Sequence, residues 1–167
     1  ENIEVTEDTS ELVKALAEAL KEEVDSGGVE VENLGQQIII RINEKGSFPA
    51  GLAFLQPRFR PVIQKVAQLL ATIPGMITVA GHTGKETLHS ELYRSKWDLS
   101  SQRAVSVAHE MLKVKEFNEN RLIVQGMADT QPLTDKESEL RRNRRVEISI
   151  MQGKAKLSEP LSVITNK

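Results

Sequence analysis

Three short blocks decide the fold of this chain: TVAGHT at residues 78–83, LSSQRA at residues 99–104 and NRRVEI at residues 143–148. Each block places a polar or cationic group where a regular element is expected to begin or end. Their order along the chain is strand, helix, strand. We therefore expect the three blocks to converge on one shallow site that binds an anionic ligand.

The composition limits the possible functions. With 167 residues, 39% of them hydrophobic, the chain can build one domain of ordinary size with added elements. Lysine and arginine number 22 against 24 acidic residues, so no global field favours nucleic acid or an anionic membrane. The lack of cysteine excludes disulfides and thiolate metal sites. The apolar runs are far shorter than the roughly 20 residues of a membrane span, so we expect the chain as given to be soluble.

Residues 1–49 predict an N-terminal extension made of a helix, a hairpin and a linker. Thr9 or Ser10 can cap an amphipathic helix that ends at Gly27 and Gly28. A β-branched run beyond the next turn predicts the hairpin. The loop at residues 43–56 contains Phe48 and Phe54, which we expect to hold it against the core.

Strands alternate with helices in residues 50–152, which predicts an α+β domain with a mixed sheet covered by helices. The expected helices cover residues 57–73, 99–114 and 135–142, with Asp98 as the cap of the second. The expected strands cover residues 76–80, 122–125 and 146–150. Trp97, the only tryptophan, can lie in the core or form a wall of the site, and the core is favoured. Residues 153–167 are expected to form a mobile tail.

Arg103 is the first candidate site residue. It lies about one turn into its helix, where helical side chains lean toward the N-terminus and over the preceding loop. A guanidinium there can hold a carboxylate through a planar fork. The alternative is a structural ion pair with Asp98 or with a glutamate, and the sequence favours neither reading.

The basic run at residues 141–145 is too short and too interrupted to indicate nucleic-acid binding. Alternation along the strand places Arg145 on its open face, with Glu147 and Ser149. Arg144 then lies on the opposite side at the start of the strand. Arg144 is therefore the preferred ligand contact.

Metal and catalytic sites are not predicted. His82, His89 and His109 lack a carboxylate cluster at ligand spacing. Ser100 and Ser101 suit the start of a helix and are not part of a nucleophile elbow. We therefore expect no metal, no cofactor and no enzymatic activity.

The three blocks resemble the OmpA-like peptidoglycan-binding family across residues 50–151, which implies a two-layer β/α/β/α/β sandwich. Within this family the chain is similar to the C-terminal periplasmic domain of flagellar stator B subunits of the MotB and PomB type, with the PomB type the most similar. The segments that carry this second resemblance are FLQP at residues 54–57, YRSKWDLS at residues 93–100 and RRVEISIMQG at residues 144–153.

The resemblance implies a non-enzymatic periplasmic anchor that holds an ion-driven stator to the cell wall by binding diaminopimelate in the peptidoglycan stem peptide. It also implies a single upstream helix in the inner membrane, a stator A subunit as partner, homodimerisation, and periplasmic motor ring proteins as further candidates. Because stator activation in this family rearranges the segment before the domain, the first helix is expected to detach or extend. Nucleic acid is not an expected partner.

Four residues match the family's binding positions: Thr83, Leu99, Arg103 and Arg144. Two positions depart from it, since Gly84 replaces the usual aspartate that receives the ligand ammonium and Lys96 replaces the usual asparagine. Glu86 and Asp98 are candidates to take over the acceptor role, and a preference for another stem peptide is the other explanation. The alternative function is a wall-linked module with weakened binding that acts in dimerisation or protein docking.

Overall fold

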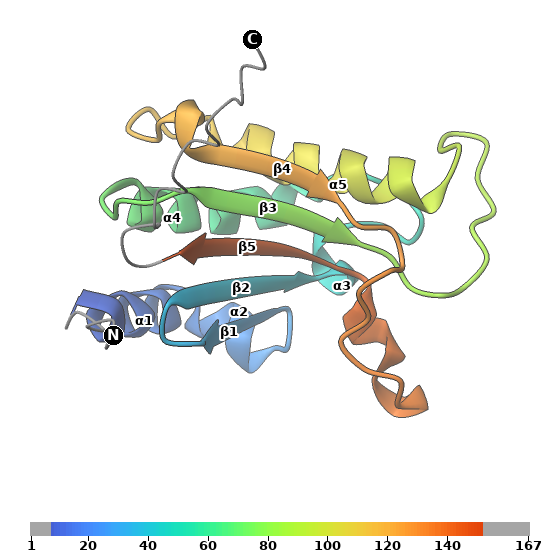
Figure 1. Ribbon diagram of the computed structural model, residues 1–167, viewed down its shortest axis with the longest axis horizontal. Coiled ribbons are helices and arrows are strands. Elements are labelled where there is room, and N and C mark those ends of the chain that lie inside the picture. The colour runs from blue at the N-terminus through green and yellow to red at the C-terminus, as the bar shows by residue number, and fades with distance from the viewer. Residues whose placement is uncertain (1–7, 152–167) are drawn as a thin grey trace, which may run out of the picture.

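The computed structural model describes residues 8–151, in which helices pack on one face of a sheet (Figure 1). The predicted tail at residues 153–167 lies outside the described residues. The helices are α1 (Asp8–Ala19), α2 (Lys21–Asp25), α3 (Glu44–Ser47), α4 (Arg60–Ala71) and α5 (Lys96–Met111), with 3-10 turns η1 (Pro57–Phe59), η2 (Glu119–Arg121) and η3 (Glu137–Asn143). The strands are β1 (Val29–Asn33), β2 (Gln37–Asn43), β3 (Ile77–His82), β4 (Leu122–Gly126) and β5 (Arg145–Met151).

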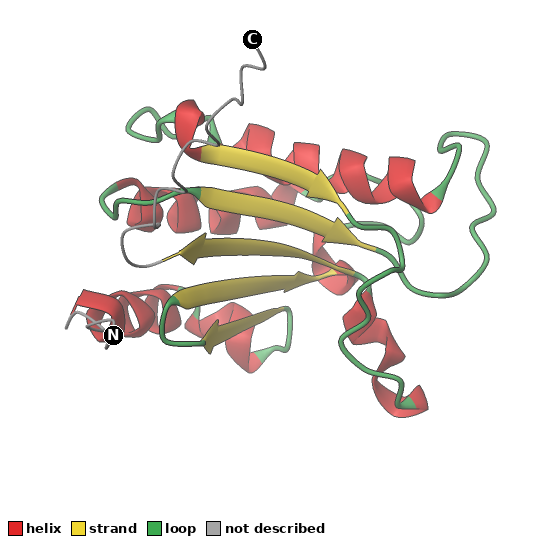
Figure 2. Cartoon of the chain, in the orientation of Figure 1, coloured by secondary structure: helices red, strands yellow, loops and turns green. Residues whose placement is uncertain are grey.

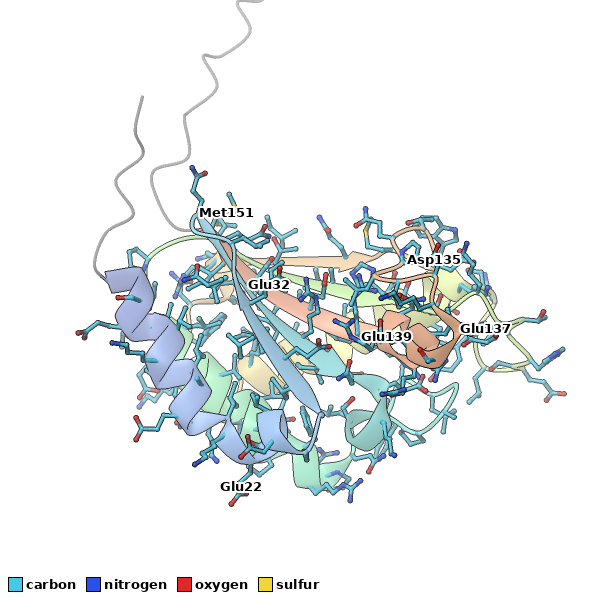
Figure 3. The ribbon with its side chains drawn as sticks, turned by 90° about the horizontal axis from the view of Figure 1, so that it is seen from below. Glu22, Glu32, Asp135, Glu137, Glu139 and Met151 are labelled. Carbon is cyan, nitrogen blue, oxygen red and sulfur yellow. The ribbon has the colours of Figure 1, made fainter. Side chains whose placement is uncertain are left out.

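The sheet has five strands in the order β1-β2-β5-β3-β4. Strand β5 runs antiparallel to both β2 and β3, whereas β3 and β4 are parallel. His82 at the end of β3 pairs with Arg145 at the start of β5, so the first and third blocks meet at one end of the sheet. Met151 and Asp135 mark opposite ends of the sheet in Figure 3. The predicted mixed sheet and α+β class are confirmed.

The N-terminal hairpin is part of this sheet. β2 pairs with β5 along seven residues, and its isoleucines Ile38, Ile40 and Ile42 lie in the same core as Ile148. Leu16 of α1 is fully buried in that core as well. The boundary predicted between residues 49 and 50 stays a prediction, but the sheet and its core extend across it.

The first helix differs in detail from the prediction. Its described part begins at Asp8, so the positions of Thr9 and Ser10 fall within the helix and not before its first residue. The helix is also interrupted at Leu20, whose side chain is fully buried, before α2 continues to Asp25. Burial of the leucine stripe on α1 explains why this helix packs on the sheet.

Helix α5 begins three residues earlier than predicted. Ser95 is its N-cap, because its hydroxyl accepts a hydrogen bond from the backbone N–H of Asp98 at 3.2 Å. Asp98 lies in the first turn, where its carboxylate accepts from the N–H of Arg94 at 3.0 Å. The prediction that Trp97 lies in the core is wrong. It is 53% exposed, because the buried side of this helix begins at Leu99.

The start of α5 rests directly on the ends of β3 and β4. A Cβ on Gly81 would lie 2.0 Å from the carbonyl oxygen of Ser100, and one on Gly126 would lie 2.0 Å from the hydroxyl of Ser101. The Ser100 hydroxyl also accepts from the N–H of Ala128 at 3.0 Å. This close approach fixes the start of α5 against the ends of both strands and the residues that follow β4. The loop that follows β3 projects beyond the end of the sheet (Figure 2).

Candidate functional site

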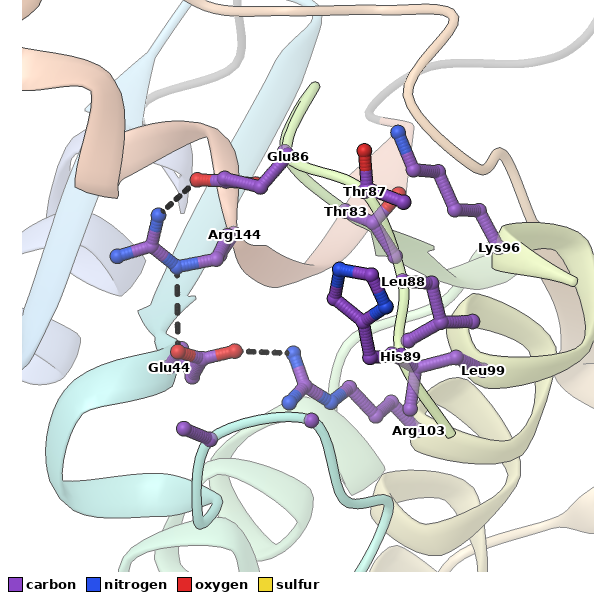
Figure 4. A pocket seen from close by; sticks show the side chains of 13 residues that line it. Glu44, Thr83, Glu86, Thr87, Leu88, His89, Lys96, Leu99, Arg103 and Arg144 are labelled. Atoms are coloured by element: carbon purple, nitrogen blue, oxygen red, sulfur yellow. Dashed lines mark hydrogen bonds and ion pairs between the residues drawn. The ribbon is translucent and has the colours of Figure 1, made fainter. Parts of the chain in front are cut away.

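All three blocks line one cavity of about 420 Å³ at this end of the sheet (Figure 4). The structure brings together the four predicted binding residues and both departing positions: Thr83, Leu99, Arg103, Arg144, Gly84 and Lys96. Asp98 is not among the lining residues. Glu44, Glu86 and His89 also line the cavity.

Arg103 is held in place by backbone groups of the loop before α4. Its Nε donates to the carbonyl oxygen of Leu52 at 2.9 Å and its Nη2 to that of Pro49 at 3.3 Å. The guanidinium lies 5.2 Å from the ring centre of Phe48, and the residue is 1% exposed. Because two of its three nitrogens bind carbonyl groups, the fork predicted for a ligand is largely occupied within the protein.

The remaining nitrogen of Arg103, Nη1, lies 2.7 Å from Oε2 of Glu44. The ion pair with a glutamate that the sequence left open is therefore present, and Asp98 is not the partner. The other oxygen of Glu44, Oε1, accepts from Nε of Arg144 at 3.1 Å. Glu44 thus connects the two arginines across the cavity, as the dashed lines in Figure 4 show.

Arg144 is the more accessible of the two arginines, with its side chain 31% exposed. Its Nη1 pairs with Glu86, whose side chain is 55% exposed. An ion pair this exposed contributes little to stability, about 0–1 kcal/mol. Arg144 can therefore change partners at small cost, whereas Arg103 cannot.

Sequence reasoning missed Glu44. It is a single acidic residue directly after β2 and belongs to no motif shared with the three blocks. The only feature of the sequence that could have indicated a site residue here is its place at the end of a strand, two residues before Gly46. Gly46 adopts φ 93°, which allows the sharp turn of α3.

Phe48 beyond this turn is buried as predicted, but Phe54 is 56% exposed.

Glu86 occupies the space that a side chain at position 84 would fill. A Cβ on Gly84 would lie 2.0 Å from Oε2 of Glu86. Of the two candidates for the missing acceptor, Glu86 therefore lies at the cavity, while Asp98 binds the N–H of Arg94. Lys96 pairs with Asp129 at 3.1 Å, and this hydrogen bond lowers the pKa of Asp129.

Thr83 contributes a hydroxyl suited to a ligand. Its backbone N–H donates to the carbonyl oxygen of Ala128 at 2.8 Å, but Oγ1 is buried and has no hydrogen-bond partner within residues 8–151. Buried hydroxyl groups nearly always have a partner in native proteins. Thr83 lines the cavity, so this unpartnered hydroxyl lies beside the site.

Arg145 lies on the sheet face predicted for it, but that face is not open at this point. The residue is 3% exposed, because its Nη1 donates to the carbonyl oxygen of Asn143 and its Nη2 to that of Gln131, each at 3.0 Å. Glu147, on the same face, accepts from its Nε at 3.3 Å. Arg145 is thus a structural residue.

The three histidines lie in different surroundings. His82 is buried beside Arg145, His89 lines the cavity, and His109 lines a separate groove between α5 and β4. Residues 8–151 contain no group of three histidine or acidic side chains positioned to hold a metal ion.

The surroundings of His82 predict that the folded domain loses stability in acid. Burial, followed by repulsion from Arg145, lowers the pKa of His82 from 6.5 to about 4, although Glu147 opposes this shift and Arg41 adds to it. The unfolded chain therefore takes up a proton between about pH 6.5 and 4 that the folded chain does not. We expect the free energy of unfolding to fall by about 3 kcal/mol as the pH drops through this window.

Urea unfolding at several pH values measures this effect. His82→Asn should flatten the dependence in that window relative to the wild type, while the exposed pocket residue His89 provides a matched control in His89→Asn. Equal slopes for the wild type and His82→Asn would show that another group causes the acid sensitivity.

Residues 47–145 match the family model described as the OmpA family, and the chain belongs to this family. YtxE of Bacillus subtilis is 33% identical over 119 residues, which are 70% of this chain and 49% of that protein. Motility protein B of Escherichia coli is 28% identical over 144 residues, 86% of this chain and 45% of that protein. The chain thus spans about half the length of these relatives.

Solved structures show the same fold. The cell wall anchor of the T6SS from Pseudomonas aeruginosa superposes with a TM-score of 0.73 at 27% identity, covering 83% of this chain and 97% of that one. The periplasmic domain of Helicobacter pylori MotB gives a TM-score of 0.69 at 22% identity, covering 78% of this chain and 85% of that one. The resemblance to OmpA-like domains of the MotB type is confirmed, and the PomB subtype stays a prediction.

Proposed function

We propose that this domain binds the peptide stem of peptidoglycan, without catalysis, and thereby holds an ion-driven flagellar stator to the cell wall. The observation that carries the proposal is that Arg103 and Arg144, far apart in the chain, line one cavity with Thr83 and Leu99 in an OmpA-family fold. Relatives named motility protein B and a structural neighbour described as a cell wall anchor support it.

The cavity offers complementary groups for the two charged ends of diaminopimelate. The arginines can receive a carboxylate, Glu86 can receive the ammonium in place of the absent aspartate, and Leu99 supplies an apolar wall for the methylene chain. The unpartnered hydroxyl of Thr83 can complete the polar contacts. This set favours a zwitterionic ligand.

The cellular setting belongs to the same proposal. The domain would lie in the periplasm as part of a homodimer, on a protein anchored in the inner membrane by one upstream helix and paired there with a stator A subunit. Periplasmic motor ring proteins are further candidate partners. None of the helices within residues 8–151 has the length and apolar content that a bilayer-spanning segment needs.

Sedimentation with purified sacculi and titration with a synthetic tripeptide ending in meso-diaminopimelate test the proposal. The wild type should bind both. Arg144→Gln and Glu86→Gln should each weaken binding roughly ten- to a hundredfold, since each removes one charged partner worth about 1.5–3 kcal/mol. Both residues are exposed enough for the variants to stay folded.

Two control variants alter charged residues that do not line the cavity. Arg142, which pairs with Glu30 and has a side chain 33% exposed, provides Arg142→Gln, and the exposed Glu91 provides Glu91→Gln. Both should bind as the wild type does. Wild-type protein that binds neither sacculi nor tripeptide would contradict the proposal, and self-association without wall binding would favour the dimerisation or docking module instead.

A further inference from the structure

We propose that Glu44 is an internal competitor for the ligand carboxylate. Its side chain occupies the position between Arg103 and Arg144 that a bound carboxylate would take, and it must rotate away before the cavity binds its ligand. This inference rests on the proposed function, because it concerns the same cavity. It adds a gate to the site and a reason for its selectivity.

The geometry of Glu44 is that of a bound carboxylate ligand. One oxygen lies 2.7 Å from Nη1 of Arg103 and the other accepts from Nε of Arg144 at 3.1 Å. Charge-assisted hydrogen bonds have these lengths. A ligand carboxylate that reached both arginines would make the same two contacts, so it and Glu44 exclude each other.

Arg103 cannot move to make room. The carbonyl groups of Leu52 and Pro49 hold two of its nitrogens, the ring of Phe48 lies beneath it, and its side chain is 2% exposed. A ligand must therefore come to Arg103 where it is. A ligand carboxylate can therefore replace the partner of Arg103 only if the side chain of Glu44 moves away.

Glu44 can move, but only by rotation of its side chain. Its backbone N–H donates to the carbonyl oxygen of Arg144 at 3.0 Å, and the preceding residue, Asn43, pairs with Arg145 at the end of β2. The main chain is thus fixed to the sheet. The side chain, in contrast, is 14% exposed at the cavity, which gives the carboxylate a route toward solvent.

Selectivity follows from the energetics of the exchange. Withdrawal of Glu44 alone leaves the buried guanidinium of Arg103 without an anion, which is strongly unfavourable. A ligand that brings a carboxylate replaces the lost partner, whereas a ligand with a carboxamide does not. The gate should therefore open for an acidic stem peptide and stay closed for an amidated one.

Isothermal titration of Glu44→Gln with the meso-diaminopimelate tripeptide tests the inference. Without the competing charge, the variant should bind roughly tenfold more tightly than the wild type, which corresponds to about 1.4 kcal/mol. The same tripeptide with its diaminopimelate carboxylate amidated should show less than about a twofold change between the two proteins. Glu110→Gln, which alters a buried glutamate outside the cavity, is the control and should leave both affinities unchanged.

Glu44→Asp provides a second variant in case Glu44→Gln does not fold. It keeps the negative charge but shortens the side chain by one methylene, so it should no longer reach both arginines and should also bind more tightly. In the wild type itself, the carboxyl carbon resonance of Glu44 should shift when the tripeptide saturates the protein. This measurement needs no substitution.

The outcomes separate the two proposals. If the wild type binds the tripeptide but the folded variants bind equally or less tightly, or if the Glu44 resonance does not shift at saturation, the gate is overturned and the proposed function stands. If neither the wild type nor any folded variant binds sacculi or tripeptide, the proposed function fails, and the inference fails with it.

Discussion

Gly81→Ala is expected to lower the free energy of unfolding by about 3 kcal/mol, because overpacking against a rigid backbone is among the more destabilising core changes. The new Cβ would lie 2.0 Å from the carbonyl oxygen of Ser100 and 2.8 Å from its carbonyl carbon. Both atoms belong to the main chain of α5, so no side-chain rotation relieves the contact. The helix must shift away from β3.

This shift should also damage the site. Thr83 follows β3, whereas Leu99 and Arg103 lie on α5, so movement of the helix separates residues that now line one cavity. Urea unfolding and tripeptide titration measure the two effects, and we expect both stability and binding to fall together.

Gly28→Ala is the matched control for this prediction. Gly28 does not require a positive φ, and the nearest atom to its new Cβ would be 3.6 Å away. This variant should be unchanged or more stable by about 0.5 kcal/mol. If Gly81→Ala is as stable as Gly28→Ala, the contact between β3 and α5 is less rigid than the geometry indicates.

Local periodicity predicted most of the elements but not which of them pair. The isoleucines of β2 identify a strand, yet nothing near them indicates that the strand lies beside β5, whose residues come more than a hundred positions later. Strand pairing of this kind is decided by how the whole core packs. For this reason the hairpin was predicted as an extension but lies within the sheet.

The site shows a similar division between motif and packing. The three blocks indicated the cavity because their polar residues stand at element ends, and Thr83 and Arg144 do meet there. Glu44 had no such motif, and its importance comes from where the turn after β2 places it. Trp97 was misjudged because composition says nothing about which side of a helix faces the sheet.

Arg103→Met is expected to have an effect as large as that of Gly81→Ala, about 3–5 kcal/mol of lost stability. The substitution removes the donors to the carbonyl groups of Leu52 and Pro49. Within residues 8–151 it leaves the mostly buried carboxylate of Glu44 with Arg144 alone as an ion-pair partner. Arg144→Gln should cost about 1 kcal/mol or less, because Arg144 is partly exposed. Urea unfolding of both variants measures this contrast.

The double variant Arg103→Met with Glu44→Gln separates the charge from the backbone contacts. If the stranded carboxylate of Glu44 causes much of the loss, the double variant should be more stable than Arg103→Met alone, since removing both members of an ion pair is less harmful than removing one. If instead loss of the hydrogen bonds to the carbonyl groups of Leu52 and Pro49 causes most of the destabilisation, adding Glu44→Gln should recover no stability. In either case loss of wall binding by an Arg103 variant cannot by itself identify a ligand contact, because Arg103 also fixes the loop that forms one wall of the cavity. Arg103→Met within about 1 kcal/mol of the wild type would contradict this structural role.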